Sequence, residues 1–214
     1  MIKVRKAKKV PASLHKNPCT AYDGQDVQTQ LITDHDGKCY LCEQLTHKSF
    51  EIEHLKPKAE GYYPELKFKW NNLFLSCPYC NGRKHNALQL LDPTTNQIEE
   101  IIEQRIDFSS QKATFESINT DKQTVDTITL LKKLHNGKNE IRDVRTNEFY
   151  KDIKQQIKGF LKLLVDYQCN PSTENKQAVI DSLHISKEFL GFKYWIIKDS
   201  DSLNATFSSY LKWN

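Results

Sequence analysis

Two Cys-x-x-Cys pairs constrain this chain more than any other feature of its sequence. Cys39 and Cys42 form the first pair, and 34 residues separate it from the second. The second pair is Cys77 and Cys80. Each pair places two sulfurs on one tight turn, and four thiolates are a preferred tetrahedral donor set for zinc. The spacing therefore predicts a structural zinc site that holds together both ends of the segment between the pairs.

Disulfide bonds and unligated buried thiols are the alternatives for these cysteines. Four of the six cysteines fall in the two pairs, which fits metal binding in a reducing compartment better than disulfides. Cys19 and Cys169 are left over and are expected to be plain thiols. The first residues lack an apolar signal core, and no run of about 18 apolar residues follows. We therefore expect a cytoplasmic protein that does not span a membrane.

The charge of the chain is modest but unevenly placed. The formal net charge is +4, yet residues 1–16 contain no acidic residue, and a second basic group surrounds the segment between the cysteine pairs. A single Lys is usually a solvated surface residue, but two basic groups beside one metal motif favour a phosphate backbone as partner. The first group is Lys3, Arg5, Lys6, Lys8, Lys9 and Lys16, and the second is Lys56, Lys58, Lys67, Lys69, Arg83 and Lys84.

The hydrophobic pattern predicts a small ββα unit within a mostly helical chain. Alternation over 50–54 and the apolar run 73–75 each predict a strand, and Cys77-Pro78 is expected to start a helix that runs through Lys84. A hairpin is predicted from 99–108 and 112–118. Apolar residues at helical spacing predict further helices at 25–35, 125–135, 140–167, 172–183 and 186–197. The expected fold class is α+β, a zinc-clipped ββα core embedded in a mostly helical chain.

Three regions follow from this pattern. Residues 1–24 are predicted to be an extended basic arm, and residues 25–95 the zinc-knuckle core. Residues 96–214 are predicted to contain the hairpin and a helical region that packs on the core and offers a surface to a partner. No Gly-, Pro- or Ser-rich linker separates the core from the helices, so one compact chain is expected.

His54 is the most informative residue between the cysteine pairs. An isolated His is more often a satisfied structural residue, but this one follows an acidic residue at a predicted strand end. A His that is neutral near pH 7 can take a proton from water as a general base. Glu53 can offer a carboxylate oxygen to a divalent cation. Glu51 lies on the same predicted strand face, so it competes with Glu53 for that role.

The polar residues that flank the second strand and the last cysteine complete the candidate site. Asn72 is expected to fasten the loop that carries His54, and Asn81 to turn a carbonyl oxygen toward the same cation as Glu53. Basic side chains nearby are expected to bind phosphate oxygens. They are Arg83, Lys84, Lys56 and Lys58. His85 is a weaker metal or phosphate candidate.

The order of these motifs resembles that of the HNH nucleases, a ββα-metal group that cleaves nucleic-acid backbones. The order is C-x-x-C, an acidic residue followed by His, Asn-Leu, and C-x-x-C followed by Asn. The resemblance covers about residues 38–86. It implies that His54 is the general base and that Asn72 orients its loop. It also implies that Glu53 and Asn81 bind one Mg²⁺ or Mn²⁺ ion. Glu53 stands where Asp is commoner, and Asn81 where His names the motif, but both remain oxygen ligands suited to Mg²⁺.

A narrower resemblance extends along the chain. The stretches IEHLKPK and WNNLFLSCPYCNGRK, followed by a helical tail, look like the HNH effector of Septu-type and retron-associated antiphage systems. That resemblance implies an ABC-type or SMC-like ATPase as partner. The expected function is metal-dependent hydrolysis of phosphodiester bonds, with DNA favoured and little sequence preference. The alternative is a non-catalytic zinc-knuckle subunit, either nucleic-acid-binding or a scaffold, in which His54 only packs.

Overall fold

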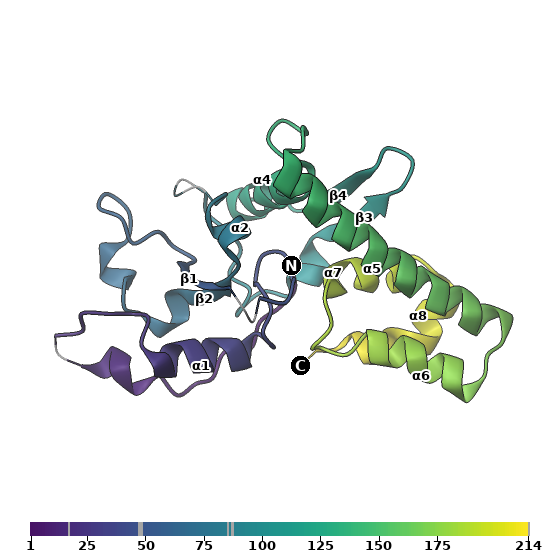
Figure 1. Ribbon diagram of the computed structural model, residues 1–214, viewed down its shortest axis with the longest axis horizontal. Helices are drawn as coiled ribbons and strands as arrows, with labels where there is room; N and C mark the ends of the chain where they lie inside the picture. Colours follow the sequence, from purple (N-terminus) through teal and green to yellow (C-terminus); the bar gives the residue numbers. More distant parts are fainter. Residues whose placement is uncertain (17, 47–48, 85, 87, 214) are drawn as a thin grey trace.

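The computed structural model describes residues 1–16, 18–46, 49–84, 86 and 88–213 (Figure 1). The molecule is elongated, with α1 (Gln25–Asp34) and the first two strands at one end and α6 (Thr173–Ser182) and α8 (Asp201–Phe207) at the other. In the described chain, no helix is both long and apolar enough to cross a membrane.

The predicted ββα unit is present and follows directly from its side-chain pattern. β1 (Glu51–His54) pairs antiparallel with β2 (Leu73–Ser76), in a register that sets His54 opposite Leu73. Leu73 and Leu75 pack with residues of α1, whereas Phe74 between them joins the central core. Two-residue alternation thus lets a two-stranded sheet bury both of its faces.

The helix that closes this unit is shorter than the sequence pattern predicts. α2 spans Pro78–Asn81, and Cys77 is its N-cap, with its sulfur accepting from the Cys80 amide. The prediction that this helix runs through Lys84 is wrong. The amides of Arg83 and Lys84 both donate to the Cys80 carbonyl, so the chain finishes in one tight turn beyond Asn81.

The remaining chain is a hairpin followed by helices, and the predicted α+β class is confirmed. β3 (Glu103–Asp107) pairs antiparallel with β4 (Lys112–Glu116). α4 (Lys122–Asn136) ends before Gly137, which has a φ of +86° and at which a Cβ would clash with the Ile141 carbonyl oxygen. The other elements are α3 (Ile98–Ile101), α5 (Val144–Cys169), α7 (Leu190–Lys198), and the 3₁₀ helices Ala12–His15, Pro64–Leu66, Trp70–Asn72 and Ser208–Leu211.

Three boundaries differ from the sequence pattern. Residues 98–101 form a helical turn, so the first hairpin strand begins at Glu103 and not at residue 99. α5 begins at Val144, because Asp143 caps it by accepting from the Thr146 amide. α7 begins at Leu190, because Phe189 before it adopts a left-handed φ of +55°.

The basic segment at 1–24 lies against the body of the molecule. Met1, Ile2 and Val4 are buried, since the apolar residues that alternate with its charges face inward. Lys6 is half-buried: its ammonium lies over the Trp70 ring and donates to the Leu73 carbonyl at 2.5 Å. Burial lowers the pKa of Lys6 to about 7.

Two of the three apolar cores share the helices α5 and α7. The central core contains the four paired cysteines, and the N-terminal half of α5 packs into it through Phe149, Ile153 and Ile157. The C-terminal half of α5 contributes Phe160 and Leu164 to a second cluster, formed with residues of α6, α7 and α8. α5 therefore links the cysteine cluster to the helical end of the molecule (Figure 1).

Candidate active site and metal centre

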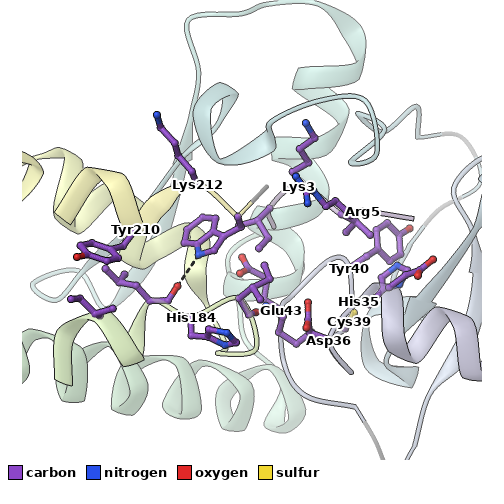
Figure 2. A pocket seen from close by; sticks show the side chains of 18 of the residues that line it. Lys3, Arg5, His35, Asp36, Cys39, Tyr40, Glu43, His184, Tyr210 and Lys212 are labelled. Carbon is purple, nitrogen blue, oxygen red and sulfur yellow. Dashed lines mark hydrogen bonds between the residues drawn. The ribbon is translucent and has the colours of Figure 1, made fainter. Parts of the chain in front are cut away.

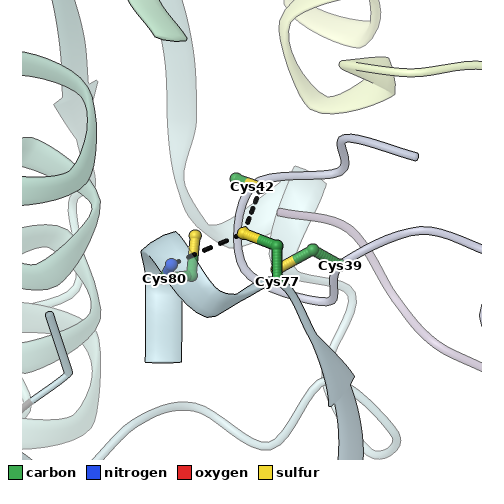
Figure 3. A group of neighbouring side chains, drawn as sticks. All are labelled: Cys39, Cys42, Cys77 and Cys80. Atoms are coloured by element: carbon green, nitrogen blue, oxygen red, sulfur yellow. Dashed lines mark hydrogen bonds between the residues drawn. The ribbon is translucent and has the colours of Figure 1, made fainter. Parts of the chain in front are cut away.

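The four cysteines converge in the centre of the molecule (Figure 3). All four are buried, and their sulfurs lie within 4.8 Å of one another. The Cys42 and Cys77 sulfurs are 3.9 Å apart. A zinc ion with Zn–S bonds of about 2.3 Å requires tetrahedron edges of about 3.8 Å. Soft donors at this spacing fit a structural zinc ion and leave it no open coordination position.

The neighbouring thiols favour a thiolate at Cys39. Burial alone would raise the pKa of Cys39, but hydrogen bonds from the other three thiols outweigh it, so this pKa lies well below its usual value. The loop around the first pair is held by backbone bonds, including the Tyr40 amide to the Leu75 carbonyl at 2.9 Å. The cluster is thus joined directly to the strand that pairs with β1.

His54 is fixed at the end of β1 with one nitrogen committed. It is 4% exposed, and its Nε2 lies 2.9 Å from the Lys67 carbonyl oxygen. A carbonyl oxygen only accepts, so Nε2 carries the proton of the neutral ring and Nδ1 remains an acceptor. Burial lowers the pKa of His54 to about 4, although the Lys67 carbonyl opposes that shift. At neutral pH the ring is therefore uncharged, with Nδ1 as its acceptor nitrogen.

Asn72 clamps the loop that follows His54. Its Oδ1 accepts from the Lys56 amide at 2.8 Å, and its Nδ2 donates to the Lys56 carbonyl at 2.9 Å and the Leu66 carbonyl at 3.3 Å. The Asn72 carbonyl also accepts from the Leu55 amide. The buried Asn72 amide thus joins both ends of the loop between the strands, the loop whose Lys67 carbonyl orients the His54 ring.

Glu53 is paired with a lysine that sequence reasoning assigned to phosphate. The Lys84 ammonium lies 2.5 Å from Glu53 Oε1, and the exposed fractions of the two side chains are 4% and 14%. The same ammonium donates to the His54 carbonyl oxygen. Burial raises the pKa of the Glu53 carboxyl, although the charge of Lys84 acts against it. Lys84 is therefore placed at the metal-type carboxylate and not on the open surface.

Asn81 lies beside the other carboxylate of β1. Its amide nitrogen donates to Glu51 Oε2, while Glu51 itself is exposed. Glu53, His54 and Asn81 nevertheless line one cavity of about 440 Å³, and Glu51 is not among its lining residues. A carboxylate and an amide oxygen in a polar cavity suit a hard divalent cation such as Mg²⁺ or Mn²⁺.

The other predicted phosphate contacts divide into two groups. Arg83 is engaged, because its guanidinium stacks 3.9 Å from the centroid of the Tyr79 ring and donates to Asp143 at 2.7 Å. Lys56 is exposed, and Lys58 lines the His54 cavity. Arg83 is thus paired with a carboxylate, whereas no such ion pair is seen for Lys56 or Lys58 among the described residues. His85 lies outside the described residues.

Two residues at the site were missed by sequence reasoning. The Tyr22 ring packs edge-on against His54, with centroids 4.6 Å apart, and its hydroxyl accepts from Lys58. Nothing in the sequence around Tyr22 marks it, since it precedes the first cysteine pair. The sequence marks Lys67 only as a positive charge. Its backbone carbonyl, however, accepts from His54 Nε2 and so determines which ring nitrogen carries the proton. Contacts of this kind depend on the path of the loop, which no local pattern specifies.

Comparison with known proteins identifies the same segment. Residues 39–87 match the family described as HNH endonuclease. The Septu protein PtuB of Bacillus mycoides (strain KBAB4) is 37% identical over 84 residues, and PtuB of Bacillus thuringiensis is 36% identical over 73 residues. Each match covers 33% of this chain and 28% of the relative. The chain therefore matches less than a third of the length of these curated relatives.

Proposed function

We propose that this protein hydrolyses phosphodiester bonds of nucleic acid with a divalent metal ion, since residues 39–87 match the HNH endonuclease family. One observation carries the proposal: His54 is held neutral, with Nε2 committed to Lys67 and Nδ1 left to accept a proton. Glu53 and Asn81 line the same cavity as His54, so the general base and the oxygen ligands can act on the same bound substrate.

The residues divide the work as follows. His54 Nδ1 takes a proton from the water that attacks phosphorus. Asn72 and the Lys67 carbonyl keep the ring in the orientation that this step needs. A cation bound by Glu53 and Asn81 would supply positive charge for the phosphate oxygens and the leaving 3′ oxygen. Lys56 and Lys58 hold phosphates on either side without reading bases.

We extend the proposal to the biological setting. The two curated relatives are named Septu proteins, which supports a role in bacterial antiphage defence. In this setting the nuclease acts on DNA in the cytoplasm together with an ABC-type or SMC-like ATPase. Ile141, just before α5, and Val144, its first residue, are each 75% exposed and give the helical region an apolar surface for such a partner.

The first experiment tests the general base. His54→Ala should lower the rate of plasmid cleavage in Mg²⁺ by about 10²-fold to 10⁴-fold, because a positioned base contributes about that much. Zinc content and circular dichroism should stay at the wild-type level. The assay is run with and without a co-purified ATPase. Wild-type cleavage by folded His54→Ala would overturn the assignment.

The second experiment tests the metal ligands. Glu53→Gln and Asn81→Ala should each raise the Mg²⁺ concentration required for half-maximal cleavage. Glu51→Gln is the matched control, since it removes the same charge two residues away but does not line the cavity. A larger effect from Glu51→Gln than from Glu53→Gln would place the cation at the exposed end of β1.

The alternative function is a zinc-knuckle subunit that binds nucleic acid without cleaving it. It requires His54 to be a packing residue, and the edge-on contact with Tyr22 is the observation in its favour. It predicts that His54→Gln leaves nucleic-acid binding unchanged and that the wild-type protein shows no cleavage with any divalent ion.

A further inference from the structure

A second cavity lies where the N-terminal segment, the cysteine loop and the C-terminal residues meet (Figure 2). Its volume is about 480 Å³, within the range of roughly 300–1,000 Å³ typical of small-molecule sites. None of the described residues that line it also lines the His54 cavity. The nuclease proposed above therefore makes no use of it.

The walls of this cavity are apolar and aromatic. Ile2, Val4 and Leu183 are buried and provide the aliphatic surface. Tyr210 and Trp213 provide flat rings, and the Trp213 indole is held in place because its Nε1 donates to the Leu183 carbonyl at 2.7 Å. A fixed indole beside a cavity is a surface on which a flat aromatic ligand can stack.

Three cationic side chains line the same cavity. Lys3, Arg5 and Lys212 come from the two ends of the described chain, and Figure 2 shows Lys3 and Lys212 on one side of it. Among the described residues, none of these three side chains is paired with a carboxylate. By contrast, the Lys38 ammonium is already occupied by the carbonyls of Ile185 and Lys187. The unpaired charges are therefore available to an anion.

Among the acidic residues that line the cavity, some carboxylates already accept hydrogen bonds from the protein and one does not. Glu43 accepts from the amides of Leu190 and Gly191, and Asp34 accepts from the Ala7 amide. The Asp36 carboxylate has no hydrogen-bond partner among the described residues, and Figure 2 shows it directed into the cavity. It can accept a hydrogen bond from a ligand amine while the cations hold an anionic group.

We propose that this cavity binds a nucleoside phosphate. The Trp213 and Tyr210 rings stack on the base, Lys3, Arg5 and Lys212 hold the phosphate, and Asp36 accepts from an exocyclic amine. The same chemistry is offered by a free mononucleotide and by the phosphorylated end of a nucleic-acid strand. The site is independent of His54, so its test requires no cleavage.

The test is calorimetric titration of the full chain with AMP, without divalent ions. A ligand of this size binds with a dissociation constant of about 10 µM at an ordinary energy per atom. Adenosine and inorganic phosphate should each bind at least about tenfold more weakly, because each lacks half of the recognised chemistry. UMP, which has no exocyclic amine, should bind more weakly than AMP.

Matched variants test whether AMP binds in this cavity. Removing three surface cations, in Lys3→Ala/Arg5→Ala/Lys212→Ala, should weaken AMP binding about tenfold to thirtyfold. Lys8→Ala/Lys9→Ala removes exposed cations from the same segment, outside the lining, and should leave binding unchanged. Asp36→Ala, which removes the acceptor, should abolish the preference for AMP over UMP.

The two sources of the ligand are separated by a competition experiment. An oligonucleotide with a 5′ phosphate should displace AMP if strand ends enter the cavity, and the same oligonucleotide without that phosphate should not. Displacement by neither would assign the site to free nucleotides. No saturable AMP binding up to roughly 1 mM, or equal losses in the Lys8/Lys9 control, would overturn the proposal.

Discussion

At the scale of single residues, Lys84 changes the picture of the candidate catalytic site. Its ammonium contacts both the Glu53 carboxylate and the His54 carbonyl. It therefore touches the residue expected to bind the metal ion, Glu53, and the residue expected to act as general base, His54. A cation that binds Glu53 through the same oxygen must displace this ammonium. Lys84 therefore balances the charge of Glu53 when no divalent ion is bound.

We predict that Lys84→Met strengthens divalent-ion binding in the absence of nucleic acid. Removing the ammonium leaves the Glu53 charge without its partner, so the dissociation constant for Mn²⁺ should fall roughly tenfold. Electron paramagnetic resonance of free Mn²⁺ measures this directly. Arg83→Met removes a neighbouring charge that is paired with Asp143, and it should have little effect. Unchanged or weaker Mn²⁺ binding by Lys84→Met would contradict the prediction.

His135 shows how one buried ring affects stability. It is 1% exposed, its centroid lies 4.8 Å from that of Phe115 and 5.1 Å from that of Phe149, and burial lowers its pKa to about 3. Below about pH 6.5 the unfolded chain takes up a proton here that the folded chain refuses. The free energy of unfolding must therefore fall as the pH drops from about 6.5 toward 3.

We predict that His135→Leu reduces this acid sensitivity. Between about pH 7.5 and about pH 5, the variant should lose roughly 2 kcal/mol less free energy of unfolding than the wild type. Urea unfolding at the two pH values measures the difference. His15→Gln, at an exposed position, is the control and should follow the wild type. Parallel losses in His135→Leu and wild type would show that another group titrates in this range.

At the scale of secondary-structure elements, the start of α7 depends on a residue far away in the sequence. The Glu43 carboxylate accepts from the Leu190 amide at 2.7 Å and the Gly191 amide at 3.2 Å. Two otherwise unpaired N–H groups of the first turn are thus satisfied by the loop that contains the first cysteine pair. Gly191 also allows the Gln104 side chain to approach closely, since a Cβ there would lie 2.5 Å from it.

We predict that Glu43→Gln destabilises the protein by about 3 kcal/mol, because it removes a buried charge from partners that remain buried. The free energy of unfolding in urea, measured with protein that contains zinc, gives the value. Glu148→Gln removes an exposed carboxylate from α5 and should cost less than about 0.5 kcal/mol. A loss below about 1 kcal/mol for Glu43→Gln would mean that solvent reaches the α7 terminus.

The elements themselves were predictable where a local rule governs them. Alternation located β1, and the apolar repeat over 125–135 located α4 to within one residue of its C-terminal end. Prediction failed where a distant contact decides the boundary. α7 begins at Leu190 and not at residue 186, since its first amides are bound by Glu43. α8 was not predicted, because its seven residues carry only a weak apolar repeat.

At the scale of the whole molecule, the cysteine cluster lies in the central core and not at its edge. All four cysteines belong to that core together with Phe149 and Ile153 of α5, and Glu43 of the same loop caps α7. The sequence placed the four sulfurs together through their spacing alone. It gave no sign that they would also support the helical region, because that contact joins residues 147 positions apart.

We predict that Cys77→Ser releases zinc and destabilises the entire chain. A structural zinc ion contributes its binding free energy to folding, so one lost ligand should remove cooperative unfolding of both cores. Elemental analysis and thermal unfolding of anaerobically purified protein test this. Cys169→Ser, at an exposed position, should keep zinc and the wild-type melting temperature. Wild-type protein without zinc, or a Cys77→Ser variant whose α5–α8 region melts as before, would contradict the prediction.

Because none of the four cysteines is more than 8% exposed, the burial of the cluster also has a kinetic consequence. A chelator in solution cannot reach an ion enclosed by these sulfurs until the surrounding core opens. The rate of zinc loss should then become independent of chelator concentration once the chelator is in excess. That limiting rate equals the rate at which the core around the cluster opens. The rate of zinc loss would therefore report the rate of spontaneous unfolding.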